Sequence, residues 1–404
     1  MRILVVNYEF PPVGGGGGVA AFRLAREWAR QHHVDYVTSR VGGGPAHQVV
    51  DGINVFSVGA LGRKDPHVAP MGSLLCYPLT GFACAARLFA RGRYDVINTH
   101  FAIPSGPLGF ALSALFRVPN VLSVHGGDIY DPSRRLSPHR CKPLGLTVRA
   151  MLRAATLVVA QSRDTAANVL KYYGSGLEPK VRVVPLPLAP PPAAARVVEK
   201  EQIRAELSLD PDVRYIISVG RLIKRKAFDR LILSLEHLPE DVGLLLVGDG
   251  PLRGELEGIA GARNLSRRVR FAGYVTDEEK FRYLAAADLY VLSSYHEGFG
   301  LVLQEAMSVG LPIVATSHGG QTDIVEDGVN ALLIESNEPP AIAAAVRTIM
   351  GDAALRDAMA RANREKVKQF EPSRIAARYV ELFREVISAA RSVRAAGHGP
   401  GGWS

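Results

Sequence analysis

Short apolar runs alternate with amphipathic stretches along most of the sequence, and this alternation constrains the fold more than any other feature. Seven runs in the first half are predicted as strands: Arg2 to Asn7, Val34 to Thr38, Asn54 to Val58, Asp95 to Thr99, Asn120 to Val124, Leu157 to Gln161 and Val181 to Val184. Amphipathic stretches such as Ala20 to Gln31 and Ser162 to Tyr173 lie between several of them. Strands that alternate with helices predict βαβ units and a mostly parallel sheet.

The alternation stops once and then resumes. Leu186 to Ala195 is rich in proline, which stiffens the backbone and removes amide donors, as expected of a connection between domains. After it, six more strands are predicted: Tyr215 to Val219, Gly243 to Val247, Val269 to Phe271, Leu289 to Leu292, Pro312 to Ala315 and Ala331 to Ile334. A chain of 404 residues is also longer than one hydrophobic core usually serves. We therefore predict an α/β protein with two Rossmann-like domains.

These signals predict the division of the chain. Residues 1–188 form the first Rossmann-like domain, 189–199 the linker and 200–370 the second domain. Residues 371–392 form a closing helix that packs back on the first domain, and 393–404 are a disordered, glycine-rich tail. Two such domains leave a cleft between them. Because ligands of open parallel sheets bind beyond the carboxyl ends of the strands, functional residues should lie just after strands.

Composition excludes several classes of protein. The sequence is 47% apolar and 22% charged, which is ordinary for a globular α/β protein and unlike a disordered or fibrous one. Its three cysteines, Cys76, Cys84 and Cys141, have neither the count nor the spacing of a disulfide framework or a zinc site. We expect them to be buried thiols in a reducing cytoplasm.

No signal peptide or membrane span is predicted. Met1 to Pro12 contains Glu9 and two prolines before any apolar core of a signal peptide could form, so it is predicted to begin with a strand. Pro66 to Ala86 and Val96 to Phe116 are uncharged and long enough to span a bilayer, but both contain internal proline, glycine and histidine. We interpret each as a loop followed by a buried helix.

Positive charge is concentrated in the first half of the chain. Residues 1–200 carry a net charge of +12 and residues 201–404 one of −3, so the first half accounts for the whole excess of +9. Arg134 to Arg153 contains six basic residues and no acidic one. Such a patch suits phosphate-bearing or membrane-surface partners, and a solvated basic face that only aids solubility is the alternative.

A glycine-rich loop follows the first strand. Gly14 to Gly18 precedes a helix expected to begin near Ala20, so the backbone can approach a diphosphate closely beside the helix N-terminus. A merely flexible loop is the alternative. The loop matches neither the G-x-x-x-x-G-K-[ST] motif nor the dinucleotide-binding pattern followed by an acidic strand end. Nucleotide hydrolases and dehydrogenases are therefore disfavoured.

Two polar side chains follow the strand Asn120 to Val124. His125-Gly126-Gly127-Asp128 places an imidazole and a carboxylate at a strand tip that faces the predicted cleft, where both can contact sugar hydroxyls. A histidine with a purely structural role is the alternative.

In the second half, basic residues cluster after the strand Tyr215 to Val219. They are Arg221, Lys224, Arg225 and Lys226. Four cations at one strand end suit a departing diphosphate that needs charge neutralisation, and a solvated basic loop is the alternative.

A pair of glutamates follows the strand Leu289 to Leu292. Glu297 lies in the turn and Glu305 two helical turns further on, with Gly298 and Gly300 freeing the amide groups at the helix start. One element therefore offers carboxylates for hydroxyl groups and amide donors for phosphate. A chance pair of surface glutamates is the alternative, and the Gly-Phe-Gly sequence at the junction disfavours it.

The segment E-G-F-G-L-V-L-Q-E-A-M-S-V-G-L-P-I-V-A-T resembles the E-x7-E signature of family-four retaining glycosyltransferases of the GT-B fold. Other resembling segments are the early glycine loop, H-G-G-D, S-V-G-R-L-x-x-x-K, V-G-D-G-P at Val247 to Pro251, F-A-G-Y-V at Phe271 to Val275 and G-G-Q-T-D-I-V at Gly319 to Val325. The resemblance covers nearly the whole chain. It is highly specific for the family and only weakly specific for the substrate.

The resemblance implies roles in binding the donor. Arg221 and Lys226 would hold the diphosphate, Glu297 the sugar and Glu305 the ribose hydroxyls. Main-chain groups would support the phosphate and sugar at Gly298, Phe299, Gly300 and Leu301, and the residues facing the base would be Gly273, Tyr274 and Val275.

The first domain would complete the site. His125 would contact the transferred sugar, and Gly17 and Gly18 would help to bind the donor. The residues assigned to the acceptor are Gly16, Asp128, Arg134 and Arg135. One departure from the family pattern, Pro185-Leu186-Pro187-Leu188 in place of P-N-G-[VI]-D, means that no role carries over to that loop.

The resemblance also implies the reaction: a hexose moves from a nucleotide-diphosphate sugar to a glycan, lipid-linked or other cell-envelope acceptor with retention of configuration. No metal or cofactor is expected. In agreement, the only D-x-D, Asp210-Pro211-Asp212, lies in a turn before a strand. We expect a cytoplasmic protein, peripheral on the inner face of an anionic membrane, with no nucleic-acid partner.

Other functions stay open at this stage. A sugar-nucleotide epimerase of the same fold would release an altered donor without an acceptor. A non-catalytic nucleotide-sugar-binding protein is disfavoured because both glutamates and the cations occur together. A nicotinamide dehydrogenase is the third and weakest alternative.

Overall fold

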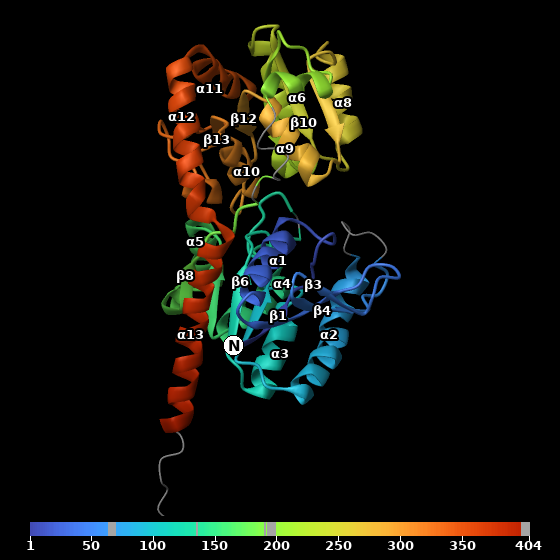
Figure 1. The fold of residues 1–404 in the computed structure, drawn as a ribbon, viewed down its shortest axis with the longest axis vertical. Helices are drawn as coiled ribbons and strands as arrows, with labels where there is room; N and C mark the ends of the chain where they lie inside the picture. Colours follow the sequence, from blue (N-terminus) through green and yellow to red (C-terminus); the bar gives the residue numbers. More distant parts are fainter. Residues whose placement is uncertain (64–69, 135, 190, 192–198, 397–404) are drawn as a thin grey trace, which may run out of the picture. The chain divides into compact units, whose positions relative to one another are not determined.

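The computed structural model describes residues 1–63, 70–134, 136–189, 191 and 199–396. They form two compact units (Figure 1): unit 1 is Met1–Pro187 together with the chain from Pro372 onward, and unit 2 is Leu188–Glu371. Of the predicted linker 189–199, residues 190 and 192–198 lie outside the described residues. Of the predicted tail 393–404, residues 397–404 do so too.

The described part of unit 1 is built on an eight-stranded sheet in the order β3-β4-β2-β1-β5-β6-β7-β8. Its strands are β1 (Arg2–Val6), β2 (His33–Ser39), β3 (His47–Val50), β4 (Ile53–Val58), β5 (Val96–His100), β6 (Asn120–Val124), β7 (Leu157–Ala160) and β8 (Val181–Val183). All seven predicted strands are confirmed. The sequence interpretation missed β3, a short edge strand antiparallel to β4, because no run of apolar residues marks it.

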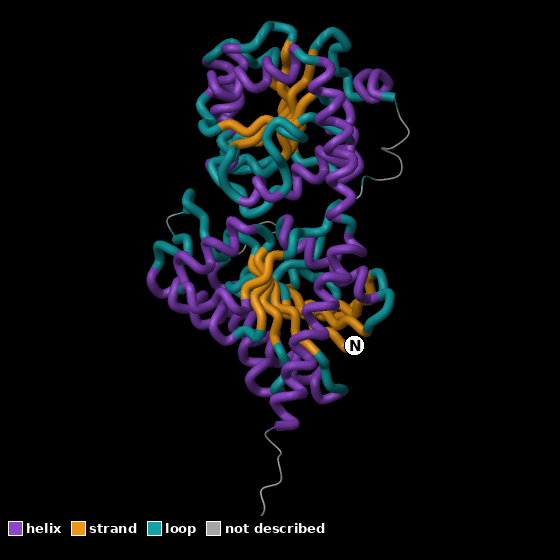
Figure 2. Tube along the Cα trace, turned by 90° about the vertical axis from the view of Figure 1, so that its left-hand side faces the viewer, coloured by secondary structure: helices purple, strands orange, loops and turns teal. Residues whose placement is uncertain are grey.

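Helices cover the sheet of unit 1 (Figure 2). They are α1 (Gly16–Ala29), α2 (Met71–Arg91), α3 (Gly106–Phe116), α4 (Lys142–Ala154), α5 (Arg163–Tyr173), η1 (Ser175–Lys180) and α13 (Pro372–Ala396). Two predicted boundaries were wrong. Helix α1 begins at Gly16 rather than near Ala20, and α13 continues for four residues into the predicted tail.

Helix α13 belongs to the core of unit 1, although its sequence follows unit 2. It packs along α1, where the Trp28 indole Nε1 donates to the Ala376 carbonyl oxygen at 3.1 Å. The rings of Tyr379 and Phe383 lie against the same indole, at 5.6 and 5.1 Å between ring centroids. Aromatic pairs of this kind bury large apolar areas, so this helix contributes directly to the stability of unit 1.

Helix α2 differs from its prediction as a buried helix. Its apolar side chains are divided between two faces: Tyr77, Ala85 and Leu88 lie in the core of unit 1. Leu75 and Leu79, in contrast, are 70% and 74% exposed. By length and composition α2 is also the one helix in the described part of the chain that could cross a membrane. The fully buried Tyr77 hydroxyl donates to the Val37 carbonyl oxygen, so α2 packs here on the sheet.

Unit 2 contains a six-stranded, all-parallel sheet in the order β11-β10-β9-β12-β13-β14. Its strands are β9 (Arg214–Val219), β10 (Val242–Val247), β11 (Val269–Gly273), β12 (Leu289–Leu292), β13 (Ile313–Thr316) and β14 (Leu332–Ile334), which confirms all six predicted strands. Its helices are α6 (Lys200–Glu206), η3 (Lys224–Lys226), α7 (Phe228–Ser234), η4 (Leu235–His237), α8 (Arg253–Ala262), α9 (Asp277–Ala286), α10 (Leu301–Val309), η5 (Gly320–Asp323), α11 (Pro339–Gly351), α12 (Ala353–Lys366) and η6 (Val367–Phe370).

The strand order of unit 2 explains where a ligand can bind. From β9 the chain adds β10 and β11 on one side, then returns to place β12, β13 and β14 on the other. The strand order thus reverses between the neighbouring strands β9 and β12, and ligands of open parallel sheets bind beyond the carboxyl ends of the strands at such a reversal. In unit 1 the same reversal occurs between β1 and β5, which are hydrogen-bonded neighbours.

Candidate functional site

In unit 2, a buried carboxylate lies where the loops after β9 and β12 meet. Glu297, in the loop after β12, accepts from the Lys226 ammonium at 2.6 Å and from the Arg225 guanidinium at 3.3 Å. The Ser294 hydroxyl donates to the same carboxylate at 2.9 Å. Burial alone would raise the pKa of Glu297, but Lys226 and Arg225 outweigh it and lower the pKa to about 2. Glu297 is therefore ionised throughout the physiological pH range.

Backbone contacts hold the Glu297 loop in place. Arg225 donates to the His296 carbonyl oxygen at 2.9 Å, and its own carbonyl oxygen accepts from the Tyr295 amide at 2.9 Å. From the other side, the Gly320 amide donates to the Glu297 carbonyl oxygen at 2.7 Å. A side chain at Gly319 would meet that oxygen at 2.9 Å, and its φ of 102° also favours glycine. The loops after β9, β12 and β13 together fix the position of Glu297.

The four basic residues after β9 separate into two groups. Lys226 and Arg225 turn toward Glu297, with Lys226 only 8% exposed. Arg221 is exposed and forms no ion pair within the described residues, so its charge is available to a ligand. The sequence identified the cluster but assigned no separate role to Arg225. Its reach to Glu297 depends on the turn η3.

Glu305 is the second glutamate of the pair, and it lies on α10. Its side chain is buried and accepts from the Lys280 ammonium at 2.7 Å. Lys280, on α9, also pairs with Asp277 at 2.9 Å. Burial alone would lower the pKa of Lys280, but the two carboxylates outweigh it and raise the pKa. Sequence reasoning missed Lys280 because nothing near it marks a site.

The other residues predicted to bind the donor differ in how accessible they are. Helix α10 begins at Leu301, immediately after Gly300, whose φ of 105° makes the turn from the loop possible. The Phe299 side chain is buried against Phe370, so only its backbone is left for a ligand. Tyr274, which directly follows β11, is 73% exposed.

A carboxyl group already contacts the glycine loop of unit 1. The Glu9 carboxylate accepts from the Gly15 and Gly18 amides at 3.0 and 3.1 Å, at the N-terminus of α1. Burial raises the pKa of Glu9, although these amides favour its charged form. Two amides of the loop that was expected to approach a diphosphate therefore have a carboxyl partner within the chain.

Asp128 connects the loops that follow β5 and β6. Its two carboxylate oxygens accept from the backbone amides of His125 at 2.8 Å and Ala102 at 2.7 Å. Burial raises the pKa of Asp128 to about 6. These two hydrogen bonds of Asp128 help to hold Phe101 at a φ of 70°, which is uncommon for an aromatic residue. The centroid of the Phe101 ring lies 4.4 Å from that of the His125 ring.

The remaining predicted residues of unit 1 are two glycines at the start of α1 and two arginines before α4. Gly17 packs beside Phe101 and His125, since a Cβ atom there would lie 3.2 Å from His125 Nδ1. Gly16 is the first residue of α1. Arg134 is mostly exposed and pairs with Asp131 at 3.1 Å, and Arg135 lies outside the described residues.

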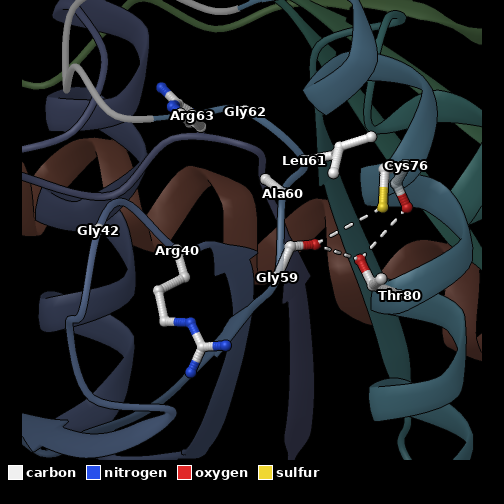
Figure 3. Close-up of a pocket in the computed structure, with 9 residues that line it drawn as sticks. All are labelled: Arg40, Gly42, Gly59, Ala60, Leu61, Gly62, Arg63, Cys76 and Thr80. Carbon is white, nitrogen blue, oxygen red and sulfur yellow. Dashed lines mark hydrogen bonds between the residues drawn. The ribbon is translucent and has the colours of Figure 1, made fainter.

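A cavity of about 450 Å³ lies at the carboxyl ends of β2 and β4 (Figure 3). It is lined by the loops Arg40–Gly42 and Gly59–Arg63 and by Cys76 and Thr80 of α2. None of the residues predicted for the site lines it. The better candidate is the cluster around Glu297, because charged groups converge there at a reversal in strand order.

Two further sequence features lie away from these clusters. The turn Asp210-Pro211-Asp212 is closed by the Asp212 amide, which donates to the Asp210 carboxylate at 3.0 Å. In the part of the chain that the structure describes, no three His, Cys, Asp or Glu side chains are grouped to hold a metal ion. Leu188, in the segment that departs from the family pattern, donates its amide to the Phe370 carbonyl oxygen at 2.8 Å.

Comparison with known proteins agrees with this architecture. The family model of the glycosyl transferases group 1 matches residues 199–366, and that of glycosyltransferase family 4 matches residues 14–190. A D-inositol 3-phosphate glycosyltransferase from Xylanimonas cellulosilytica is 28% identical over 93% of both chains. A glycosyltransferase of Methanocaldococcus jannaschii is 27% identical over 88% of this chain and 91% of its own.

Solved structures give the same result for the fold. The sucrose-phosphate synthase of Thermosynechococcus elongatus superimposes with a TM-score of 0.84 and 25% identity, over 96% of this chain and all of its own. Anabaena HepE in complex with UDP and glucose superimposes with a TM-score of 0.77 and 22% identity, over 95% and 99% of the two chains. The chain therefore belongs to the family-four glycosyltransferases, the glycosyl transferases group 1, and has their GT-B fold.

Proposed function

We propose that this protein is a retaining, metal-independent hexosyltransferase that moves a hexose from a nucleotide-diphosphate sugar to a glycan or lipid-linked acceptor of the cell envelope. The cluster of Lys226, Arg225 and Glu297 carries the proposal. It combines a carboxylate that is ionised at physiological pH with a buried ammonium and a half-buried guanidinium at a reversal in strand order. The relatives support it by their names, and HepE by its bound UDP and glucose.

Lys226 and Glu297 would act on opposite ends of the bond that breaks. As the sugar leaves, negative charge grows on the diphosphate, where Lys226 and the exposed Arg221 stabilise it. The Glu297 carboxylate accepts hydrogen bonds from sugar hydroxyls and keeps the ring in place. Because its three protein donors hold it rigidly, little reorganisation is needed during the reaction.

The proposed reaction is tested with a panel of UDP-, GDP- and ADP-hexoses. Binding is measured by calorimetry, and products formed with cell-envelope glycolipids as acceptors are identified by mass spectrometry and by the configuration of the new bond. We expect one donor class to bind and transfer with retention, at a rate that EDTA does not change. An altered donor released without acceptor, or no binding by any donor, would overturn the proposal.

Glu305 should affect donor binding more than the chemical step. A carboxylate that holds ribose hydroxyls does so equally before and during the reaction, so its loss raises KM and leaves kcat nearly unchanged. We expect Glu305→Ala to raise the donor KM by about tenfold or more, since it removes hydrogen bonds to a charged group. Steady-state kinetics measure both constants. The exposed Glu255→Ala on α8 is the matched control, and an unchanged KM in Glu305→Ala would contradict the assignment.

We also propose that unit 1 contacts an anionic membrane surface from the cytoplasm. Helix α3 packs against both α2 and α4. Large apolar side chains are exposed on or near these helices: Leu61, Met71, Leu75, Leu79, Phe110, Leu115, Leu136 and Leu146. Exposed basic residues accompany them: Arg134, Arg140, Lys142 and Arg153. Apolar and basic side chains together are typical of proteins that lie on an anionic bilayer.

Vesicle sedimentation tests this contact. Each basic residue near an anionic surface contributes on the order of 1 kcal/mol, so several together give salt-sensitive binding. We expect the protein to pellet with anionic vesicles at low salt and to stay in solution with neutral ones. Changing Arg134, Arg135, Arg140 and Lys142 to glutamine should abolish pelleting.

A second set of glutamine substitutions separates position from net charge. It changes four exposed basic residues of unit 2, namely Arg267, Arg347, Arg361 and Lys368. This variant has the same net charge as the first but should still pellet. Equal partitioning to both vesicle types, or to neither, would contradict the membrane contact and leave the donor chemistry untouched.

A further inference from the structure

A half-buried lysine on α9 contacts the second glutamate of unit 2. Helices α9 and α10 pack against each other (Figure 1), and Lys280 of α9 reaches Glu305 of α10 across this contact. The Lys280 ammonium donates to Glu305 Oε1 at 2.7 Å and to Asp277 Oδ1 at 2.9 Å. The Lys280 and Glu305 side chains are 15% and 8% exposed, and that of Asp277 is 70% exposed. The family resemblance assigns Glu305 to the ribose and gives Lys280 no role.

The Glu305 carboxylate depends on Lys280 for its position. Within the described residues, Lys280 is the one group that donates a hydrogen bond to this carboxylate, and Oε2 accepts none. Glu297 differs, because both of its carboxylate oxygens have protein donors. A buried carboxylate without a cation or donor is costly, so Glu305 without Lys280 would turn toward water. The contact therefore occupies one oxygen of Glu305 and leaves the other for a ligand.

Lys280 itself is held firmly at the start of α9. Its helix begins with a capping box, in which the Glu279 amide donates to the Thr276 hydroxyl at 3.2 Å and the Glu279 carboxylate accepts from the Thr276 amide at 2.8 Å. Burial opposes the charge of Lys280, but Glu305 and Asp277 outweigh it and raise its pKa, so the ammonium stays charged. Two of its three N–H groups are thus directed at carboxylates of the protein.

We infer that Lys280 is a positioning residue for the donor nucleotide: it holds Oε1 of Glu305 and keeps Oε2 available to the ribose hydroxyls. This inference rests on the proposed function, which brings a nucleotide-diphosphate sugar to unit 2 with its ribose at Glu305. A carboxylate that is already held needs no ordering when the ligand arrives, so binding loses less side-chain entropy. Because Lys280 acts through Glu305, its removal should weaken only the part of binding that comes from the ribose hydroxyls.

Nucleotides with and without those hydroxyls test this role. Calorimetry compares UDP, GDP and ADP with their 2′,3′-dideoxy forms. For the wild-type protein, loss of the hydroxyls should raise the dissociation constant of the preferred nucleotide about tenfold or more, because hydrogen bonds to a charged group are lost. We expect Lys280→Met to weaken binding of the complete nucleotide about tenfold and binding of the dideoxy form less than about twofold.

Three further variants separate positioning from a general loss of charge. Lys280→Arg keeps a cation that can donate to Glu305 and should recover most of the affinity. Asp277→Asn removes only an exposed partner and should change affinity less than about twofold. Lys366→Met is the matched control: Lys366 pairs with Glu326 at 3.6 Å elsewhere in unit 2, and both nucleotide forms should bind this variant as they bind the wild-type protein.

Two other measurements follow the same contact. With the complete donor, Lys280→Met should raise KM and leave kcat nearly unchanged, as expected of a group that acts on binding. In the ligand-free protein, Lys280→Met leaves the buried Glu305 carboxylate without its cation and should lower the free energy of unfolding. Adding Glu305→Gln removes that carboxylate, so the double variant should be more stable than Lys280→Met alone.

Two results would overturn the inference. One is an equal loss of affinity for both nucleotide forms in Lys280→Met, which would mean that Lys280 contacts the ligand directly or only supports the fold. The other is an absence of coupling between Lys280 and Glu305 in denaturant unfolding. If none of the three nucleotides binds the wild-type protein, the proposed function fails instead, and the unfolding measurements still decide whether Lys280 holds Glu305.

Discussion

Replacing Lys226 with alanine is expected to lower kcat by about a hundredfold or more, because it removes charge where negative charge develops in the transition state. The substitution should also change Glu297, whose carboxylate lies 2.6 Å from the Lys226 ammonium. In the wild-type protein the pKa of Glu297 is about 2. Without Lys226, only Arg225 and the Ser294 hydroxyl remain to counter the effect of burial, so the pKa of Glu297 should be higher. Activity should then fall on the acid side at a higher pH than in the wild-type protein.

The pH profile also has a counterpart in stability. A carboxyl group whose pKa is lowered on folding stabilises the protein above its unfolded pKa, and this contribution is lost as the pH falls toward the folded value. For Glu297 the window lies between about 4.5 and about 2. Lys226→Ala should narrow this pH window. The free energy of unfolding, measured with denaturant, should therefore differ less between pH 3 and pH 7 than it does in the wild-type protein.

Two neighbouring cations serve as comparisons for Lys226. Lys224 is exposed in the same turn, and Lys224→Ala should stay within about twofold of the wild-type rate because each surface charge contributes little. Arg221→Ala should lower kcat about as much as Lys226→Ala, since both cations would stabilise the same leaving group. It should leave the acid limb of the profile unchanged, because Arg221 does not pair with Glu297. A wild-type rate in Lys226→Ala would contradict the role of Lys226 in stabilising the leaving diphosphate.

Replacing Glu297 with alanine or glutamine is expected to lower kcat by about a hundredfold or more and to change the donor KM little. An interaction with the reacting sugar that strengthens in the transition state appears in kcat. Alanine also leaves Lys226 and Arg225 without their carboxylate, so it should destabilise the loop. Glutamine keeps an acceptor for the Ser294 hydroxyl and loses only the charge.

Comparing the two substitutions separates folding from catalysis. Both should show low kcat and lose the stability that the ionised carboxylate contributes at pH 7, but Glu297→Ala, which also removes the acceptor of the Ser294 hydroxyl, should lose more stability in denaturant unfolding. Glu335→Ala, at an exposed position in the same unit, is the matched control. If Glu297→Gln raised KM while Glu305→Ala lowered kcat, the roles of the two glutamates would be exchanged.

The strands were predictable from the sequence because their burial depends on local pattern. The runs Asn120–Val124 and Leu289–Leu292 are apolar throughout and lie between helices, so the strands begin and end as predicted. The pair Glu297 and Glu305 was predictable for a related reason. Glu297 lies in the loop that follows β12 and Glu305 on the helix that follows this loop, and parallel strands bring their carboxyl ends to one edge of the sheet.

Helix ends in unit 1 were less predictable. Glycine disfavours helices, so α1 was expected to begin only near Ala20. The Glu9 carboxylate supplies an acceptor for the Gly15 and Gly18 amides, and the helix begins at Gly16. The partner lies before the loop in sequence, and its orientation depends on how the chain turns after β1.

By itself, the sequence determined the two Rossmann-like units, their strands and the residues at the strand ends, because periodicity and turn chemistry are local properties. Tertiary structure alone decided which polar side chains meet. Lys280 reaches Glu305 from another helix, Arg225 reaches Glu297 across a reversal in strand order, and His100 reaches His125 from a neighbouring strand. Such pairs depend on side chains that approach within about 3 Å after the sheet has formed, and the spacing of residues along a chain does not specify that approach.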